Sequence, residues 1–421
     1  MIISVIGLEE IAIALATLSL IIWAGLLTLW GRFWLADQRL DTASPDIAST
    51  NTTSTTSNPT LPSVAVIIPA RNEAALIAQA IRSHLTQTYA GPLSILLVDD
   101  QSTDGTAAIA IAQNKQSEKS DSNQTSNQTP LAHRSLTVLN GKPLPSGWTG
   151  KLWAMEQGFR HLQQNRQPSL QPDYVLFTDA DIKHNSENIY QLVLKAEKDQ
   201  LDLVSLMVKL RCQSHWEKLL IPAFVFFFQM LYPFPWVNNP HKRIAAAAGG
   251  CALVRFSALE RINGLQTIRN ALIDDCALGA AIKQEGAIWL GLSTTTQSLR
   301  PYPTLESIWE MVARSAYTQL RYSPWLLAGT VVGMLLMYIA SPLAVGIGIV
   351  SGQWGLALIG SSAWGFMALA YWPTLKLYDG SPWLAPTLPG IAFLYLLMTL
   401  DSAQRHWRGQ GGLWKGRVHE A

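Results

Sequence analysis

Residues 64–100 read VAVIIPARNEAALIAQAIRSHLTQTYAGPLSILLVDD, and this stretch carries clear signals of secondary structure. A short β-branched run over 64–68 predicts a strand, the stretch from about Glu73 to Gln87 predicts a helix, and Ser94 to Val98 predict a second strand. Strand, helix and strand in this order predict a parallel sheet in an α/β domain. A further apolar strand is expected from Tyr174 to Thr178.

Polar side chains follow each of these strands. Pro69, Arg71 and Glu73 come after the first strand, Asp100 after the second, and Asp179-Ala180-Asp181 after the third. Ligands in open α/β sheets gather at the carboxyl ends of strands. The sequence therefore predicts that two acidic clusters face one crevice.

The pair Asp179 and Asp181 suits a divalent cation, Mg²⁺ or Mn²⁺, which prefers oxygen ligands and is usually held by one or two carboxylates plus substrate phosphates. Taken alone the tripeptide is weak evidence, because paired aspartates are also common at surfaces and helix caps. Asp104, in the loop after the second strand, is more simply explained as the start of a helix. The metal interpretation depends on the accompanying motifs.

One such motif is Asp274-Asp275, which lies in an otherwise apolar stretch. Adjacent carboxylates in such surroundings repel each other and lose hydration, which raises a pKa towards the range useful to a general base. The alternative is a solvated helix start. Arg314, just before a long apolar block, could pair with a diphosphate or could be an arginine that reaches to a membrane interface.

The composition indicates a membrane protein. Of 421 residues, 48% are hydrophobic and only 14% are charged, and sixteen are tryptophan. The formal net charge of +2, without a basic run, argues against a nucleic-acid partner. Three scattered cysteines offer neither a zinc knuckle nor a redox pair.

An N-terminal membrane anchor is expected over Ile11 to Trp30, an apolar run of about twenty residues. Glu9 and Glu10 precede this run, whereas arginines follow it, so the positive-inside rule places the next domain in the cytoplasm. Three further membrane segments fit the C-terminal part of the chain, at about 326–350, 354–372 and 385–401.

These three segments conflict with the charge rule, because three true crossings would put the basic tail outside. One of them is therefore expected not to cross, either the Pro-rich last segment or the first, which Pro342 interrupts. The aromatic stretch 216–236 is short for a span and contains prolines, and it is interpreted as an interfacial or substrate-facing element rather than a core helix.

The expected organisation has five parts. Residues 1–40 form the anchor and 41–62 a flexible linker. Residues 63–322 form the catalytic domain, with a disordered insertion at about 113–134, and 323–402 hold the C-terminal membrane segments. Residues 403–421 form a basic tail.

The order of these motifs resembles the family-2 glycosyltransferases with a GT-A fold, over roughly residues 62 to 320. Strings at 147–154, 245–251 and 269–276, and Trp414-Lys415-Gly416-Arg417 near the end, resemble more closely the hopene-associated glycosyltransferases of bacterial hopanoid gene clusters.

The resemblance implies a role for each motif. Pro69, Arg71, Glu73 and Asp100 would bind the nucleoside, and Lys151 would lie near the donor. Asp179 and Asp181 would engage the metal and the diphosphate, and Asp275 would be the base, with Asp274 and Arg314 also in the catalytic set.

Two departures from the family pattern affect these roles. The family's Glu-Asp reads Asp274-Asp275 here, which keeps the base. The acceptor-side motif Gln/Arg-x-x-Arg-Trp keeps only Arg314, which leaves acceptor binding and processivity open.

The expected function is inverting transfer of a sugar from a UDP-sugar to a lipid acceptor, a hopanoid or polyprenoid, at the cytoplasmic face of a bacterial inner membrane. One alternative is a processive polysaccharide synthase. Another is a non-catalytic nucleotide- or lipid-binding membrane protein. The chain lacks both the Gly-x-Gly-x-x-Gly of dinucleotide oxidoreductases and the phosphate loop of P-loop ATPases.

Overall fold

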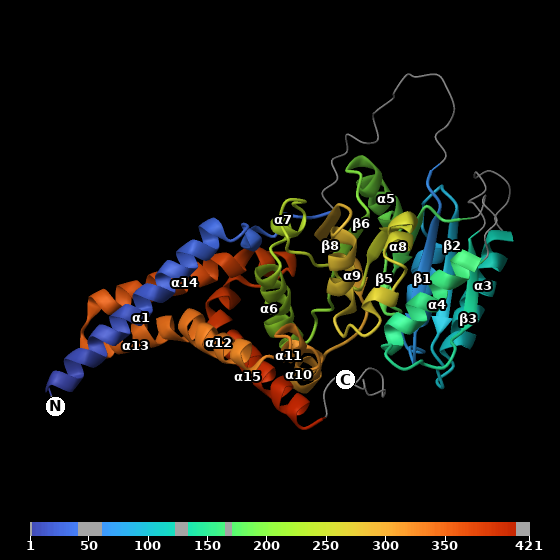
Figure 1. Ribbon diagram of the computed structural model, residues 1–421. Coiled ribbons are helices and arrows are strands. Elements are labelled where there is room, and N and C mark those ends of the chain that lie inside the picture. The colour runs from blue at the N-terminus through green and yellow to red at the C-terminus, as the bar shows by residue number, and fades with distance from the viewer. Residues whose placement is uncertain (1, 41–60, 123–133, 165–170, 410–421) are drawn as a thin grey trace, which may run out of the picture. The chain divides into compact units, whose positions relative to one another are not determined.

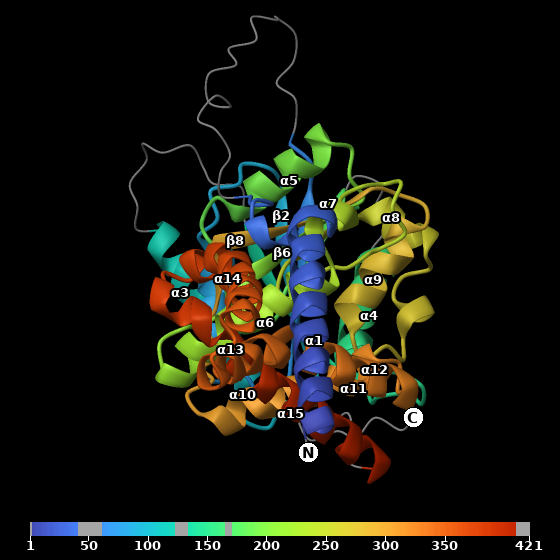
Figure 2. The same ribbon diagram turned by 90° about the vertical axis from the view of Figure 1, so that its left-hand side faces the viewer.

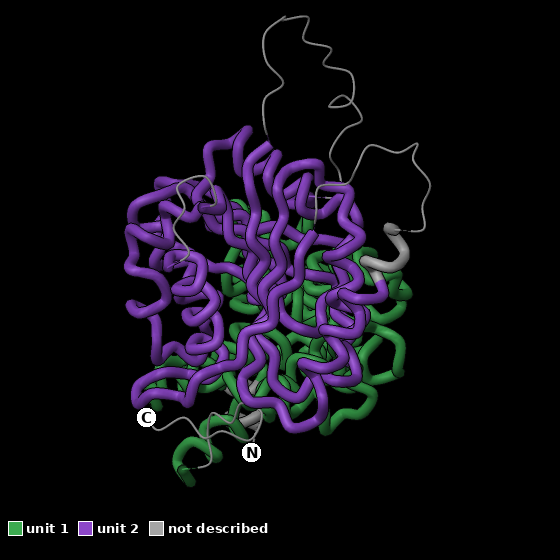
Figure 3. The backbone as a smooth tube through the Cα atoms, turned by 90° about the vertical axis from the view of Figure 1, so that its right-hand side faces the viewer, with its two compact units in different colours: residues 1–37, 211–236, 301–413 green, residues 38–210, 237–300, 414–421 purple. Residues whose placement is uncertain are grey.

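The computed structural model describes residues 2–40, 61–122, 134–164 and 171–409. The chain divides into two compact units, coloured separately in Figure 3. Residues 1–37, 211–236 and 301–413 make up the helical unit, and residues 38–210, 237–300 and 414–421 the sheet unit. The predicted linker, part of the predicted insertion and the string Trp414 to Arg417 lie outside the described residues.

The sheet unit is built on an eight-stranded sheet of order β3-β2-β1-β4-β7-β6-β8-β5 (Figure 1). Its strands are β1 Val64–Ala70, β2 Leu93–Asp99, β3 Ser135–Asn140, β4 Tyr174–Phe177, β5 Ile182–Lys183, β6 Leu203–Lys209, β7 Ala252–Arg255 and β8 Ile288–Ser298. Its helices are α2 Ile77–Leu85, α3 Thr106–Ser122, α4 Gly150–Gln164, α5 Asn188–Lys198, α8 Phe256–Arg261, η3 Gln266–Ile268 and α9 Asp274–Lys283.

The sheet is mixed but mostly parallel, as the sequence predicts. β1 pairs in parallel with β2 and β4, β2 with β3, and β6 with β8, whereas β7 is antiparallel to both of its neighbours. Every residue of β1 is buried, which is expected of a central strand covered by helices on both faces. The carboxyl ends of β1, β2, β4, β6 and β8 therefore lie at one edge of the sheet.

One predicted boundary is wrong. The polar stretch from Gln113 continues α3 as far as Ser122 instead of leaving the fold. Glutamine, lysine and glutamate are good helix formers, and this stretch contains no glycine or proline. The rest of the predicted insertion, residues 123–133, lies outside the described part of the chain.

The helical unit gathers three separate parts of the sequence. Its elements are α1 Ile2–Leu29, η1 Phe33–Leu35, α6 His215–Leu231, α7 Phe234–Val237, α10 Leu305–Ala313, α11 Ala316–Gln319, α12 Pro324–Met334, η4 Leu335–Ile339, α13 Ala340–Ser351, α14 Trp354–Leu377, η5 Pro382–Thr387 and α15 Leu388–Trp407. Within the described residues, five segments are long and apolar enough to cross a membrane: Glu9–Leu29, His215–Val237, Pro324–Ser351, Trp354–Leu377 and Pro382–Trp407.

Contacts within the helical unit fix the direction of three of these segments (Figure 2). Trp23 Nε1 donates a hydrogen bond to the Met337 carbonyl at 2.9 Å, and Ala16 packs against Ala344, so α13 runs antiparallel to α1. Ala16 also packs against Leu356 at the start of α14, and Phe226 contacts both Phe33, after α1, and Tyr371, in the later part of α14, so α14 runs parallel to α1. Each of these helices traverses the length of the unit.

The segment after α14 behaves differently. Trp364, in the middle of α14, donates to the Pro386 carbonyl at 2.9 Å, so η5 has already turned back to half the depth of the unit. From there α15 returns, and its Ala403 packs against Leu327 near the start of α12 and against Tyr317. The end of α14 and the end of α15 therefore lie at the same end of the helical unit.

Proline interrupts the first C-terminal segment without stopping it. η4 is a single π-helical turn, and Pro342 follows it within a continuous helix. A π turn supplies the extra residue that lets the chain pass a proline ring.

The aromatic segment predicted to be interfacial forms α6. Its Phe226 is buried against Phe33 and Tyr371 within the helical unit, and Gln229 donates to Thr374 at 3.3 Å. α6 thus packs as a member of the helix bundle, and its position relative to a membrane stays a prediction.

Candidate active site

The predicted acidic clusters meet at the carboxyl edge of the sheet. β1 ends at Ala70 before Arg71, β2 ends before Asp100, and β4 ends before Asp179 and Asp181. Because β1 lies between β2 and β4, these polar side chains follow three adjacent parallel strands. The sheet topology thus places them as the sequence predicts.

Lys151 is the centre of the charged cluster. It lies in the first turn of α4, where its Nζ is 2.8 Å from Asp179 Oδ1 and 3.0 Å from Asp274 Oδ2. Burial alone would lower the pKa of Lys151, but Asp179 and Asp274 outweigh it and hold the pKa above its ordinary value. Burial raises the pKa of Asp179, and the lysine opposes that shift only in part. Lys151 therefore joins the end of β4 to the start of α9.

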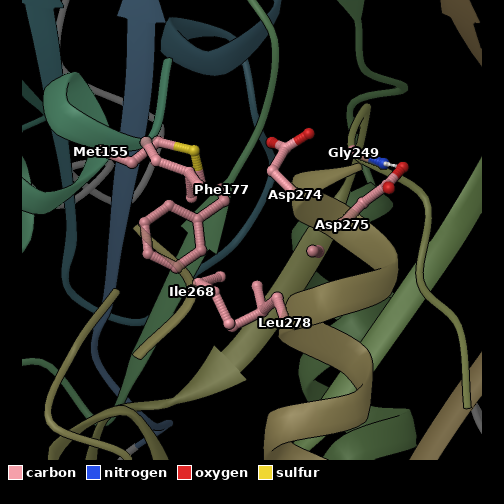
Figure 4. Close-up of a pocket in the computed structure, with 9 residues that line it drawn as sticks. Met155, Phe177, Gly249, Ile268, Asp274, Asp275 and Leu278 are labelled. Atoms are coloured by element: carbon pink, nitrogen blue, oxygen red, sulfur yellow. Dashed lines mark hydrogen bonds between the residues drawn. The ribbon is translucent and has the colours of Figure 1, made fainter. Parts of the chain in front are cut away.

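Asp275 occupies the first turn of α9 and is held by two backbone N–H groups. Gly249 N–H donates to its Oδ2 at 2.9 Å and Cys276 N–H to its Oδ1 at 2.7 Å. In Figure 4 its carboxylate points towards Gly249, and the apolar side chains Phe177 and Leu278 line the adjoining pocket. Burial, with the neighbouring Asp274 charge, raises the pKa of Asp275 to about 6.

Glycine at position 249 is explained by this arrangement. A Cβ there would lie 3.0 Å from Lys151 Nζ, so the lysine would have to shift slightly, whereas its 3.5 Å distance from Asp275 Oδ2 would be an ordinary contact. Glycine at this position therefore leaves room for the Lys151 ammonium group beside Asp275.

Sequence reasoning missed Arg300, which follows β8 at the same edge of the sheet. Its Nε lies 2.6 Å from Asp181 Oδ2 and its Nη2 lies 2.6 Å from Glu73 Oε1. This guanidinium connects the loop after β1 with the acidic end of β4. The signal that could have found it is its position two residues after the end of a strand, but β8 was not predicted.

The predicted nucleoside residues form a second group. Arg71 Nη1 donates to the Asp100 carbonyl at 2.6 Å and lies 3.8 Å from its carboxylate. Pro69 is the penultimate residue of β1, opposite Val98 in the ladder. Asp104 accepts hydrogen bonds from the backbone of Ala74 and Thr106, which is the structural role expected of it.

Arg314 belongs to the helical unit. It is the C-cap of α10, and its side chain is exposed, so its predicted role in the site stays a prediction. The residues that the structure brings together in the sheet unit are Glu73, Lys151, Asp179, Asp181, Asp274, Asp275 and Arg300.

A buried hydrogen-bond chain runs behind these residues. The Thr178 hydroxyl donates to the Gly250 carbonyl at 2.8 Å and lies 2.8 Å from His184 Nε2, which must then be the donor to Thr178. Asn188 Nδ2 lies 2.8 Å from His184 Nδ1, and Thr296 donates to Asn188 Oδ1 at 3.0 Å. Burial lowers the pKa of His184 well below its ordinary value, so the ring stays neutral.

A divalent cation fits the donor set at the end of β4. Among the described residues, no cluster of three or more His, Cys, Asp or Glu could hold a metal by itself. Asp179 and Asp181 are oxygen donors, and the Asp179 side chain is 35% exposed, with only its Oδ1 in an ion pair among the described residues. Two carboxylates that leave room for phosphate oxygens match the way Mg²⁺ and Mn²⁺ are held beside phosphates.

The fold resembles that of a solved enzyme. The mannosyltransferase PcManGT from Pyrobaculum calidifontis, in complex with GDP-Man and Mn²⁺, has a TM-score of 0.53 and 18% identity, over 97% of this chain and 100% of that chain.

Two other solved structures are less similar. Mannosyl-3-phosphoglycerate synthase from Rubrobacter xylanophilus has a TM-score of 0.38 and 15% identity, over 70% of this chain and 83% of that chain. Glucosyl-3-phosphoglycerate synthase from Mycobacterium tuberculosis, with Mn²⁺ and UDP-glucose, has a TM-score of 0.35 and 16% identity, over 62% and 78%. No curated protein sequence matches this chain.

The mostly parallel sheet with its acidic carboxyl edge is the catalytic fold of GT-A glycosyltransferases. Glycosyl transferase family 2 matches residues 65–122, and glycosyl transferase family 21 matches residues 163–411. The second match covers more than half of the 421 residues, and the chain belongs to glycosyl transferase family 21. The expectation of a glycosyltransferase is confirmed, whereas closeness to the hopene-associated enzymes stays a prediction.

Proposed function

We propose that this enzyme transfers a sugar from a nucleoside diphosphate sugar, most simply a UDP-sugar, to a hydroxyl of a membrane lipid. The observation that carries the proposal is Asp275, which is held by Gly249 beside the Lys151–Asp179 ion pair. A base with a raised pKa thus lies next to a cationic group and a carboxylate that suits a metal.

In this proposal each group has a separate task. Arg71 and Asp100 bind the nucleoside at the ends of β1 and β2. Asp275 takes the proton of the acceptor hydroxyl while the hydroxyl oxygen attacks the anomeric carbon. The bond from that carbon to the diphosphate breaks, and the configuration at the anomeric carbon is inverted. Lys151 donates to the departing diphosphate and offsets the charge that develops there.

Asp179 and Asp181 would hold a Mg²⁺ or Mn²⁺ ion. When bound, such an ion supplies Lewis-acid neutralisation of the diphosphate charge. Asp179 would then interact with both Lys151 and the metal ion, and Asp181 would interact with both Arg300 and the metal ion. PcManGT, which has the same fold, was solved with GDP-Man and Mn²⁺, which supports a divalent cation and leaves GDP-sugars as candidate donors.

The lipid acceptor is proposed from the helical unit. Five segments in the described residues have the length and composition of membrane spans, so an acceptor dissolved in the bilayer would be within reach of a membrane-held enzyme. A hopanoid or another polyprenoid is the acceptor class that follows from the sequence resemblance. The catalytic domain would face the cytoplasm of a bacterial inner membrane.

The test uses the full-length protein purified in detergent. It is incubated with Mn²⁺, total membrane lipid and a panel of radiolabelled UDP- and GDP-sugars, and labelled lipid is identified by mass spectrometry. We expect one donor to label one lipid class with a single sugar. No labelled lipid from any donor would contradict the proposal, and long polymers would indicate a processive synthase.

A pair of matched variants separates the base from general damage. Asp275→Asn should lower turnover by about 10²–10⁴-fold, the usual contribution of a general base. Asp199→Asn removes a carboxylate at the exposed end of α5 and should retain turnover. Equal turnover in the two variants would remove Asp275 from the mechanism.

A further inference from the structure

A cluster of arginines and aromatic rings lies at one end of the helical unit. It comprises Arg314, Tyr317, Arg321, Tyr322, His406, Trp407 and Arg408, called here the basic–aromatic cluster. It joins the α10–α12 connection to the end of α15, about eighty residues later in the chain.

Tyr317 holds the cluster together. Its ring centroid lies 5.5 Å from that of His406 and 5.8 Å from that of Trp407, and its N–H donates to Ser402 Oγ at 3.0 Å. The Tyr322 ring stacks on His406 at 4.3 Å with an interplanar angle of 17°. Residues from two distant segments therefore form one built surface.

The backbone under this surface is strained. Arg321 and Tyr322 both have left-handed conformations, with φ of 52° and 54°, although neither is glycine. Each such residue costs free energy, and residues of this kind tend to persist where they serve a function. Here the strained turn stacks Tyr322 on His406 and leaves Arg321 exposed.

The arginines of the cluster keep their charge available. Nearby, Asp401 and Glu310 are already neutralised by Arg405, which lies 2.8 Å and 2.7 Å from them. Among the described residues, no carboxylate forms an ion pair with Arg314, Arg321 or Arg408, and all three are exposed. The surface therefore has a surplus of positive charge.

Two candidate membrane spans end at this surface. Tyr317 packs in one buried group with Leu327, at the start of Pro324–Ser351, and with Ala403, at the end of Pro382–Trp407. Trp325 and Trp407 are 87% and 61% exposed beside it. Tryptophans with this exposure at the ends of apolar helices are typical of the headgroup level of a bilayer.

We infer that the basic–aromatic cluster binds the headgroups of anionic phospholipids. The guanidinium groups would pair with lipid phosphates, and the aromatic rings would lie at the level of the glycerol backbone. The inference rests on the membrane placement in the proposed function but not on sugar transfer. Each arginine near an anionic surface contributes about 1 kcal/mol, a factor of about five in affinity.

The experiment measures lipid binding directly. Full-length protein in detergent is titrated with phosphatidylglycerol or phosphatidylcholine, and native mass spectrometry counts the bound lipids. The intact protein should prefer phosphatidylglycerol, and the double variant Arg321→Gln/Arg408→Gln should weaken that binding roughly 20-fold. The comparison variant, Lys376→Gln, removes a single exposed charge outside the cluster, at the end of α14, and should weaken binding no more than about fivefold.

Two outcomes would overturn the inference: equal binding of both lipids by the intact protein, or equal weakening by Lys376→Gln and the double variant. Transfer to a detergent-dissolved acceptor is measured in the same samples. The double variant should retain it. Loss of lipid binding with intact transfer would leave the proposed function standing, whereas absent transfer with normal lipid binding would count against the proposed function alone.

Discussion

Asp275 is held in surroundings that oppose its negative charge. Burial and the Asp274 carboxylate raise its pKa to about 6. The Gly249 and Cys276 N–H groups, which stabilise the charged form, offset only part of this increase in pKa. An unfolded aspartate ionises near pH 3.9, so the charged form weakens folding above that pH, fully so above about pH 6.

Asp275→Asn should therefore stabilise the protein while it removes activity. We expect the free energy of unfolding of this variant to exceed that of the unaltered protein by about 1–3 kcal/mol at pH 8. The difference should be smaller at pH 5. Thermal unfolding followed by tryptophan fluorescence at the two pH values measures this.

Asp104→Asn is the control, and it should change the stability of the protein in the opposite direction. Hydrogen bonds from Thr106 and Ala74 outweigh the effect of burial and lower the pKa of Asp104, so its charge supports the fold at neutral pH. Its replacement should lower the unfolding temperature. Destabilisation by Asp275→Asn at pH 8 would show that its charge is not opposed by the fold.

The same carboxyl sets a pH dependence for turnover. Only ionised Asp275 can accept the acceptor proton, so kcat/KM should fall tenfold for each pH unit below about pH 6 and level off above it. Initial rates measured from pH 5 to 8 at a fixed Mn²⁺ concentration test this fall of kcat/KM at low pH. A rate unchanged down to pH 5 would assign the proton to another group.

At the scale of elements, the buried chain through Thr178 connects the two halves of the site. Thr178 directly precedes Asp179 at the end of β4, and its hydroxyl holds the Gly250 carbonyl next to the glycine that binds Asp275. The chain continues through His184 into α5, so the end of β4 and the Gly249–Gly250 turn are positioned by the same hydrogen bonds.

Thr178→Val should disturb positioning more than donor binding. It leaves the Gly250 carbonyl and the His184 N–H buried without their partner, which costs about 1–3 kcal/mol of stability. We expect kcat to fall at least tenfold with little change in the donor KM, measured by steady-state kinetics. Thr178→Ser keeps the hydroxyl and should restore kcat.

Thr137→Val, on the exposed side of β3, is the control for adding a valine to a strand and should leave both kcat and stability unchanged. If Thr178→Ser were as slow as Thr178→Val, the hydroxyl would not be what positions the turn.

The sequence predicts the elements whose signals are local. β1, β2 and β4 are apolar runs that end in polar residues, and their parallel pairing follows from strand and helix order. Pairings formed between distant segments were not predictable in this way. For example, Ala252–Arg255 pairs antiparallel with β4, although about seventy-five residues separate the two strands in the sequence.

The same limit explains the missed site residue. The second half of β8 is a Ser- and Thr-rich run without apolar residues, so it was not predicted as a strand, and Arg300 could not be recognised as following one. Lys151 was found only through the resemblance, because its neighbours Asp179 and Asp274 are far from it in sequence.

At the scale of the whole chain, the packing of the helical unit bears on the conflict over membrane crossings. α1, α12–α13 and α14 traverse the unit, but η5 reaches only the level of Trp364 before α15 returns to the start of α12. Of the two segments expected not to cross, these contacts favour the Pro-rich last one. The basic tail would then leave on the same side as the end of α1, in agreement with the positive-inside rule.

Site-directed labelling tests this topology. In a background without Cys212, Cys251 and Cys276, single substitutions Gln353→Cys, Asp379→Cys and Gly409→Cys are introduced in the α13–α14 turn, after α14 and after α15. A membrane-impermeant maleimide is then added to sealed vesicles of known orientation. Asp379→Cys and Gly409→Cys should react from one side and Gln353→Cys from the other. If Gly409→Cys reacted from the same side as Gln353→Cys, α15 would be a true crossing and the basic tail would lie outside.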